Sequence, residues 1–307
     1  MRVAVTGARG RLGRALVEAL ESSPYAGVAG PLAWSRPEFD LDAPDAFDAL
    51  VERNRPEVIV HAAAWTDVDG CARDPELALA RNGHATGVLA RAAAEHGIDL
   101  VVVSTNEVFD GRRSDGVGYG PADAPNPINP YGASKLAGEQ AARASYEAAG
   151  APTAALGIVR TAWLFGPPGD DFPAKILAAA DRARASGDPL RLVADEWGSP
   201  TGAADLAEAI VELIGSAAVN GTHHIVNAGA ASRADWAHEV LRQAAVNVAT
   251  EDVPASTWQR ASTPPAWSVL APTPLPDGEP LRPWAAALAD RMPALLRERS
   301  AAAAGRR

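Results

Sequence analysis

Residues 2–21, which read RVAVTGARGRLGRALVEALE, decide the fold that we expect. Arg2 to Thr6 form a short run rich in β-branched residues, which predicts a buried strand. Glycines follow at positions 7, 10 and 13, and the apolar spacing of LGRALVEALE predicts a helix behind them. Such glycines permit a tight turn and close approach of the backbone to a pyrophosphate, which the amides of a helix N-terminus favour. The stretch therefore predicts a dinucleotide site, with a plain strand-to-helix turn as the alternative.

The remaining chain alternates expected strands with expected helices. Strands are expected at 28–34, 57–63, 100–104 and 153–160, with further candidates at 190–194 and 222–227. Helices are expected at 75–96, 131–149, 203–214 and 234–245, irregular loops at 254–284, and a frayed C-terminal end. Strands that alternate with helices imply βαβ units, so we expect an α/β fold with a doubly wound parallel sheet of the Rossmann type.

Composition and charge exclude several classes of protein. The chain has 307 residues, of which 47% are apolar and 21% charged, as in ordinary globular proteins. With 38 acidic and 28 basic residues the net charge is −10, which argues against a general nucleic-acid binder. One cysteine, Cys71, allows no multi-cysteine zinc site, and the six histidines form no ligand motif, so no metal is expected. Without a signal peptide pattern or a membrane-length apolar run, we expect a soluble cytoplasmic protein.

Tyr131 and Lys135 are the first candidates for catalysis. They lie four residues apart and so share one helix face, and Asn129 and Pro130 suit the N-cap and first position of that helix. A nearby ammonium favours the phenolate, so we expect Lys135 to lower the pKa of Tyr131. The tyrosine then exchanges a proton with a carbonyl oxygen as a hydride arrives. A surface Tyr–Lys pair is the alternative interpretation.

Hydroxyl and arginine side chains complete the predicted site. Ser104 and Thr105 end a strand where doubly wound sheets bind ligands, so we expect Thr105 to bind the carbonyl; the alternative is a plain strand end. Ser35 and Arg36 follow the second strand, where an acidic residue would favour NAD. We therefore expect NADP, with Arg9 and Arg11 as further contacts to its 2′-phosphate. NAD is the alternative, with Arg36 then on a solvated loop.

The motifs together resemble a known family. TGARGRLG, HAAAWTDVD, STNEVFDG, NPYGASKLAGE, RTAWLFG, DEWGSPTGAADLA and PPAWSVL occur in the order found in dTDP-4-dehydrorhamnose reductases, which are extended short-chain dehydrogenases/reductases. The resemblance spans about residues 1–290. It implies an NAD(P)-binding Rossmann domain (1–160 plus about 201–228) interleaved with a smaller C-terminal substrate domain (about 161–200 plus 229–298), then a disordered tail (299–307). The implied reaction is reduction by NAD(P)H of the C4 keto group of a dTDP-4-dehydro-6-deoxysugar, first of all dTDP-4-dehydrorhamnose to dTDP-L-rhamnose, in dTDP-rhamnose biosynthesis.

The resemblance also implies residue roles. Tyr131 is the implied general acid, Lys135 its pKa-lowering and ribose-binding partner, and Thr105 the carbonyl-binding hydroxyl. The implied cofactor contacts are Gly7, Arg9, Gly10, Arg11, Leu12, Gly13, Ser35, Arg36, Asp40, Leu41, Ala62, Ala63, Ala64, Ser104, Tyr131 and Lys135. The expected substrate contacts are Thr66, Val68, Asn106, Glu107 and Trp163. The expected partner is a nucleotide-sugar substrate, with no nucleic acid and no membrane, and a homodimer is left open.

Two departures from the family pattern leave the exact sugar nucleotide open. Asn106 and Glu107 stand where the family usually has Asp and Tyr, in STDYVFDG. PPAWSVL departs from the usual RPxxSxL and lacks the basic residue that usually follows. One alternative is a non-catalytic NADP-binding regulatory protein, like the regulatory subunit of methionine adenosyltransferase, which resembles the same family. Another is a nucleotide-sugar epimerase or dehydratase that uses Glu107 as an extra acid/base group.

Overall fold

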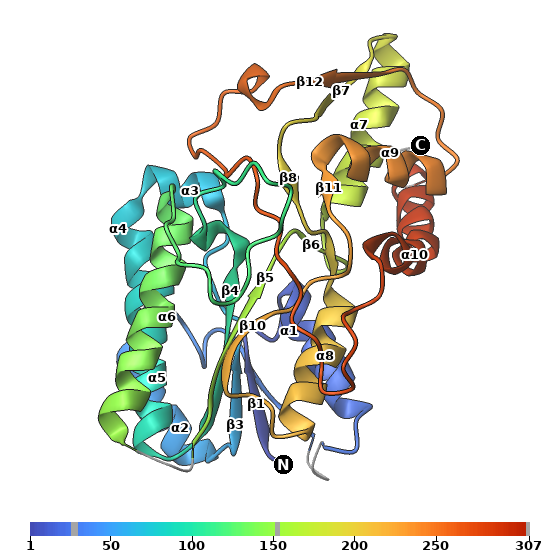
Figure 1. Ribbon diagram of the computed structural model, residues 1–307. Helices are drawn as coiled ribbons and strands as arrows, with labels where there is room; N and C mark the ends of the chain where they lie inside the picture. Colours follow the sequence, from blue (N-terminus) through green and yellow to red (C-terminus); the bar gives the residue numbers. More distant parts are fainter. Residues whose placement is uncertain (26–29, 151–153, 305–307) are drawn as a thin grey trace.

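A six-stranded parallel sheet forms the centre of the computed structural model, which describes residues 1–25, 30–150 and 154–304 (Figure 1). The strand order is β10-β5-β4-β3-β1-β2, and all five pairings are parallel. The strands are β1 (Val3–Thr6), β2 (Leu32–Trp34), β3 (Val58–His61), β4 (Asp99–Thr105), β5 (Leu156–Thr161) and β10 (Gly221–His224). The order reverses at β1, between β2 and β3, which is where doubly wound sheets open a ligand crevice. The expected α/β fold of Rossmann type is confirmed.

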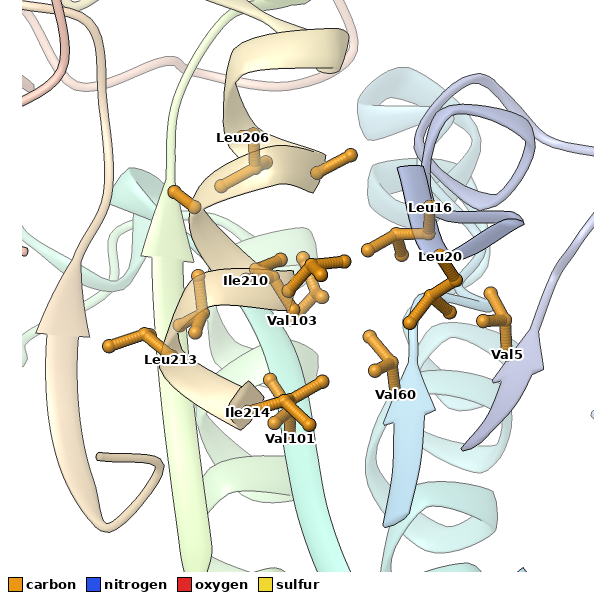
Figure 2. Packing of buried hydrophobic residues seen from close by; sticks show 14 of the residues in the cluster. Val5, Leu16, Leu20, Val60, Val101, Val103, Leu206, Ile210, Leu213 and Ile214 are labelled. Carbon is orange, nitrogen blue, oxygen red and sulfur yellow. The ribbon is translucent and has the colours of Figure 1, made fainter. Parts of the chain in front are cut away.

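Helices cover both faces of this sheet. On one face α1 (Arg11–Glu21) packs beside α8 (Ala203–Gly215), and their leucines and isoleucines meet Val5, Val60, Val101 and Val103 (Figure 2). On the other face lie α2 (Phe47–Asn54), α5 (Ala85–Glu95) and α6 (Pro130–Ala149), in a core that includes Ile59. Successive strand residues point to opposite faces, so a sheet covered on both sides needs strands that are apolar throughout. This is why the strands appear in the sequence as continuous apolar runs.

A smaller second part lies beside the carboxyl ends of the strands and has its own core (Figure 1). Its helices are α7 (Phe172–Ser186), α9 (Arg233–Gln243) and α10 (Trp284–Ala304). Its strand pairs are β7 (Leu190–Val193) with β12 (Thr250–Val253), β6 (Leu164–Phe165) with β9 (Thr201–Gly202), and β8 (Trp197–Gly198) with β11 (Ala231–Ser232). The chain returns from this part to the sheet through α8 and β10, and then leaves it again. Within the described ranges, no helix has the length and apolar character needed to cross a membrane.

The structure corrects several local predictions. Of the expected strand 28–34, only Leu32–Trp34 form β2, because residues 30 and 31 are not in a strand. Residues 26–29 and 151–153 lie outside the described part. The expected helix 75–96 is divided into α4 (Pro75–Ala78), a π-helical segment η2 (Leu79–His84) and α5. Short elements α3 (Val68–Arg73), η1 (Pro44–Ala46), η3 (Asn106–Val108) and η4 (Ala255–Thr257) complete the described fold.

The tail that was predicted to be disordered from residue 299 is drawn as helix as far as Ala304. Helix α10 continues to that residue, and 305–307 lie outside the described part. Arg299 Nε donates to Asp181 of α7 at 3.1 Å, and Leu295 is buried in the core of the second part. The Arg299 contact therefore connects α10 to α7 where the expected tail begins.

Candidate active site

Two adjoining cavities form one crevice at the carboxyl ends of β1, β3 and β4. Both are lined by Gly7, Gly10, Ala62 and Ala64, so they are continuous along the glycine loop. We call them the outer cavity, which contains Ser35 and Arg36, and the inner cavity, which contains Thr105, Tyr131 and Lys135. The outer cavity is lined by Gly7, Arg9, Gly10, Ser35, Arg36, Phe39, Asp40, Leu41, Asp42, Ala62, Ala63, Ala64, Trp65 and Arg81. All the predicted cofactor residues therefore lie along this crevice.

The glycine loop has the close geometry that its sequence predicts. Gly7 follows β1 directly and has φ of +65°, and its carbonyl oxygen accepts a hydrogen bond from the amide of Gly10 at 2.8 Å. A Cβ atom on Gly13 would lie 2.1 Å from that same oxygen, so position 13 accepts only glycine. Helix α1 begins at Arg11 without a side-chain cap or an acidic residue in its first turn. Its first amides therefore remain available to an anion in the crevice.

The outer cavity brings together three of the four side chains predicted to contact a 2′-phosphate. Ser35 Oγ accepts a hydrogen bond from the amide of Arg9 at 3.2 Å, and Arg36 lies beside them. Arg11 departs from this prediction, because its Nε donates to the carbonyl of Gly166 at 2.7 Å and its side chain lines the inner cavity. Arg11 is the first residue of α1 and faces the second part of the molecule, so it connects the two parts.

The outer cavity also contains residues that the sequence analysis missed. Arg81 makes two hydrogen bonds of 2.6 Å to the carboxylate of Asp42, and its guanidinium lies 5.2 Å from the centre of the Trp65 ring. These residues come from three separate segments, and no local pattern in the sequence connects them.

Thr105, Tyr131 and Lys135 meet in the inner cavity. Asn129 caps α6 by accepting a hydrogen bond from the amide of Gly132 at 2.8 Å, as predicted, and this places Tyr131 in the first turn. A Cβ atom at Gly132 would lie 2.0 Å from the carbonyl oxygen of Glu107, so only glycine lets α6 begin this close to η3. The geometry puts a phenol, a hydroxyl and an ammonium in one crevice.

Burial, and not Lys135, dominates the acidity of Tyr131. Burial raises the pKa of Tyr131, the negative charge of Glu107 raises it further, and a hydrogen bond with Thr105 opposes them. The expected net lowering of this pKa is therefore wrong, because burial of the phenolate determines the direction of its shift. Burial also lowers the pKa of Lys135 to about 8, against the opposing charge of Glu139. At neutral pH the site holds a neutral phenol beside an ammonium.

An ion pair lies under the lysine. Glu139, one turn after Lys135, is 1% exposed and accepts hydrogen bonds of 3.0 and 2.7 Å from Arg160 of β5. Ser104 Oγ donates to Glu139 Oε1 at 2.5 Å. Ser104 was predicted to contact the cofactor; it lines the inner cavity, but its hydroxyl is engaged by Glu139. This network keeps a carboxylate beneath the ammonium.

All five predicted substrate residues line the inner cavity: Thr66, Val68, Asn106, Glu107 and Trp163. The amide of Asn106 is already occupied, since it accepts from Thr105 at 3.2 Å and donates to the Ser268 carbonyl at 3.3 Å. Glu107 Oε2 accepts from Asn129 at 2.7 Å, and burial raises the pKa of its carboxyl. The prediction missed the wall contributed by the second part, which consists of Leu164, Phe172, Arg233 and Trp236.

Comparisons with known proteins match this chain over nearly its whole length. A family model described as "RmlD substrate binding domain" matches residues 1–296. A dTDP-4-dehydrorhamnose reductase of Streptomyces griseus is 36% identical over 95% of this chain and 93% of its own. A dTDP-4-keto-6-deoxy-D-glucose reductase of Streptomyces niveus is 34% identical, over 95% of this chain and 96% of its own. The crystal structure of dTDP-4-dehydrorhamnose reductase from Bacillus anthracis in complex with NADP is 32% identical, covers 94% of this chain and 98% of its own, and has a TM-score of 0.82.

These matches extend across both parts of the molecule and all the elements that line the crevice. Since the family model spans nearly the whole chain and full-length relatives exceed 30% identity, the chain belongs to the dTDP-4-dehydrorhamnose reductase family of extended short-chain dehydrogenases/reductases.

Proposed function

We propose that the protein is an NADPH-dependent reductase of the C4 keto group of a dTDP-4-dehydro-6-deoxysugar, with dTDP-4-dehydrorhamnose as the first candidate substrate. The observation that carries the proposal is the convergence of Thr105, Tyr131 and Lys135 in a cavity continuous with the glycine loop. The name of the Streptomyces niveus relative supports the wider substrate class, because it gives a different 4-keto sugar.

The residues around the crevice fit NADP. The free amides at the start of α1 suit its diphosphate, and Arg9, Ser35 and Arg36 suit its 2′-phosphate. The NADP in the Bacillus anthracis relative supports this choice. NADH remains the alternative cofactor, and it is separated from NADPH by comparing kcat/KM for the two.

When bound, NADPH supplies the hydride that reduces the carbonyl carbon. The chain supplies the proton and the orientation. The Thr105 hydroxyl donates a hydrogen bond to the ketone oxygen, and Tyr131 transfers its proton to that oxygen, so that the product is an alcohol. The raised pKa of Tyr131 keeps the phenol protonated at neutral pH, which is the form that donates. The Lys135 ammonium stabilises the phenolate left behind.

The test is oxidation of NADPH by the purified protein with dTDP-4-dehydrorhamnose, followed by the absorbance of reduced nicotinamide. We expect Tyr131→Phe to lower kcat by roughly 10²- to 10⁴-fold, the range for loss of a general acid. Tyr146→Phe is the matched control, because Tyr146 lies on the same helix and donates to the carbonyl of Ile98 outside the crevice. Undiminished turnover by Tyr131→Phe would refute the assigned role.

Two other functions can be distinguished from the proposed reductase by experiment. A regulatory protein would bind NADP without turnover of any deoxysugar nucleotide. An epimerase or dehydratase is kept as an alternative because Glu107 is a buried carboxyl beside Tyr131. That alternative predicts that solvent deuterium enters the sugar at C5 while the cofactor stays oxidised. A cytoplasmic location and a homodimer stay predictions.

A further inference from the structure

An aromatic cluster in the second part of the molecule encloses one guanidinium. Trp236 stacks on Phe172 with ring centres 4.1 Å apart and on Trp163 at 5.7 Å. The Arg233 guanidinium lies 3.6 Å from the centre of the Trp163 ring and 5.6 Å from that of Phe172. All four residues line the inner cavity, which the glycine loop also lines. The mechanism proposed above uses none of their polar atoms.

The guanidinium is charged, and its ion pair with a carboxylate is long. Burial lowers the pKa of Arg233 to about 10, so the group is still protonated at neutral pH. Its ion pair is with Glu196, but the Nε–Oε2 distance is 3.7 Å, which is longer than a hydrogen bond. The same carboxylate is shared with Arg260 at 3.1 Å, and the charge of Glu107 also acts on Arg233. Glu107 also faces the cavity, with a carboxyl whose pKa is raised by burial and which already binds Asn129.

The orientation of the guanidinium is fixed before any ligand binds. Trp163 has a left-handed backbone with φ of +44°, and a Cβ atom on Gly198 would lie 2.4 Å from its ring. The indole is therefore confined between β8 and Trp236, and the stacked guanidinium is confined with it. A planar guanidinium held in this way suits two oxygens of one phosphoryl group.

We propose that Arg233 binds the diphosphate of the sugar nucleotide. This inference rests on the proposed function and adds a residue that determines which substrates bind. The source of the anion is the substrate and not the cofactor, because the amides suited to the cofactor diphosphate lie at α1, whereas Arg233 begins α9 in the second part. A cation held on this wall selects nucleotide-linked sugars over free sugars.

The experiment compares dTDP with thymidine, which lacks the diphosphate, by calorimetric titration of the protein saturated with NADP. We expect the wild type to bind dTDP more tightly than thymidine. Arg233→Met should weaken dTDP binding by roughly 10- to 100-fold, the range for a charged hydrogen bond, and leave thymidine unchanged. Arg191→Met is the matched control, because Arg191 lies 5.9 Å over the exposed Trp258 and lines no part of the crevice.

Folding of the variant is controlled in two ways. Removal of Arg233 leaves Glu196 paired with Arg260, so we expect a melting temperature close to that of the wild type. Arg233→Lys keeps the charge without the planar fork and should lose less dTDP affinity than Arg233→Met. A lysine variant as weak as the methionine variant would show that the planar fork, and not the charge alone, supplies the affinity.

The other outcomes separate this inference from the proposed function. An unchanged ratio of dTDP to thymidine affinity in Arg233→Met, or a wild type that does not prefer dTDP, overturns the inference. A loss of NADP affinity in place of dTDP affinity overturns it too, since the anion would then belong to the cofactor. If dTDP binding depends on Arg233 but no deoxysugar nucleotide oxidises NADPH, the proposed reductase fails and the assignment of Arg233 stands.

Discussion

Replacing Lys135 by methionine is expected to stabilise the cofactor-free protein while it abolishes the proposed reduction. Lys135 is 3% exposed, and burial lowers its pKa from the usual 10.5 to about 8. Each pKa unit corresponds to about 1.4 kcal/mol, so this fall corresponds to about 3 kcal/mol of stability lost while the lysine is charged. Methionine keeps an unbranched side chain and removes the charge. Glu139 keeps its two hydrogen bonds from Arg160, so the variant leaves no unpaired buried carboxylate.

The pH dependence follows from the same pKa. Below pH 8 both the folded and the unfolded chain hold the proton, so the full cost of the buried charge is present. Between pH 8 and 10.5 only the unfolded chain still holds it, so a rise in pH favours folding of the wild type. The advantage of Lys135→Met over the wild type should therefore be largest at neutral pH and disappear near pH 10.5.

Denaturant unfolding of the cofactor-free protein at pH 7 and again near pH 10.5 measures this difference. The chain has only two lysines, and the second, Lys175, is exposed on α7. Lys175→Met is therefore the control, and it should change the free energy of unfolding little at either pH. The reasoning is refuted if Lys135→Met is less stable than the wild type at pH 7, or if its advantage does not depend on pH.

Three further substitutions test other parts of the crevice. Arg36→Ala should lower kcat/KM for NADPH by roughly 10- to 100-fold and leave NADH unchanged, because a charged hydrogen bond to the 2′-phosphate is lost; a parallel fall for both cofactors contradicts this. Gly13→Ala puts a Cβ atom 2.1 Å from the carbonyl oxygen of Gly7, so it should abolish NADP binding in a calorimetric titration and cost about 1–3 kcal/mol or more of stability in denaturant unfolding. Glu107→Gln removes a negative charge that raises the pKa of Tyr131, so alkaline titration of the tyrosinate absorbance should show the Tyr131 phenol ionising at lower pH than in the wild type; an unmoved titration would show that this charge does not act on the phenol.

The sheet and its nearest helices were predictable because their signals are local. The apolar runs of β1, β3 and β4 and the spacing of α1 and α6 are visible in single windows of sequence. Helix α7 was missed although its signals are local, since Asp171 is its N-cap and Gly187 its left-handed C-cap. What no local window shows is how α7 and α10 pack together. Arg291 of α10, 6% exposed, donates to Asp171 at the start of α7, and the two residues are 120 positions apart in sequence. No window of ordinary length contains both partners.

The wall that the second part contributes to the inner cavity was not predicted either, because it depends on tertiary packing. Arg233 reaches the inner cavity only because residues 161–200 and 229 onward fold together beside the sheet. A signal was nevertheless present: Ser232 and Asp235 form a capping box, which predicts that a helix begins at Arg233. That pattern gives the helix start, whereas the stacking on Trp163 depends on the tertiary fold.

Tyr131 shows that spacing in the sequence predicts which side chains are neighbours more reliably than it predicts their pKa values. The spacing of Tyr131 and Lys135 correctly places both in one crevice, but the pKa depends on everything that surrounds the phenol. Burial and the charge of Glu107 raise it, and the hydrogen bond with Thr105 opposes them only in part. The cofactor-free site is consequently filled, at neutral pH, with the protonated phenol that ketone reduction requires. Oxidation of the alcohol requires the phenolate, which the same burial disfavours, so the fraction of protein competent for that direction should grow as pH rises.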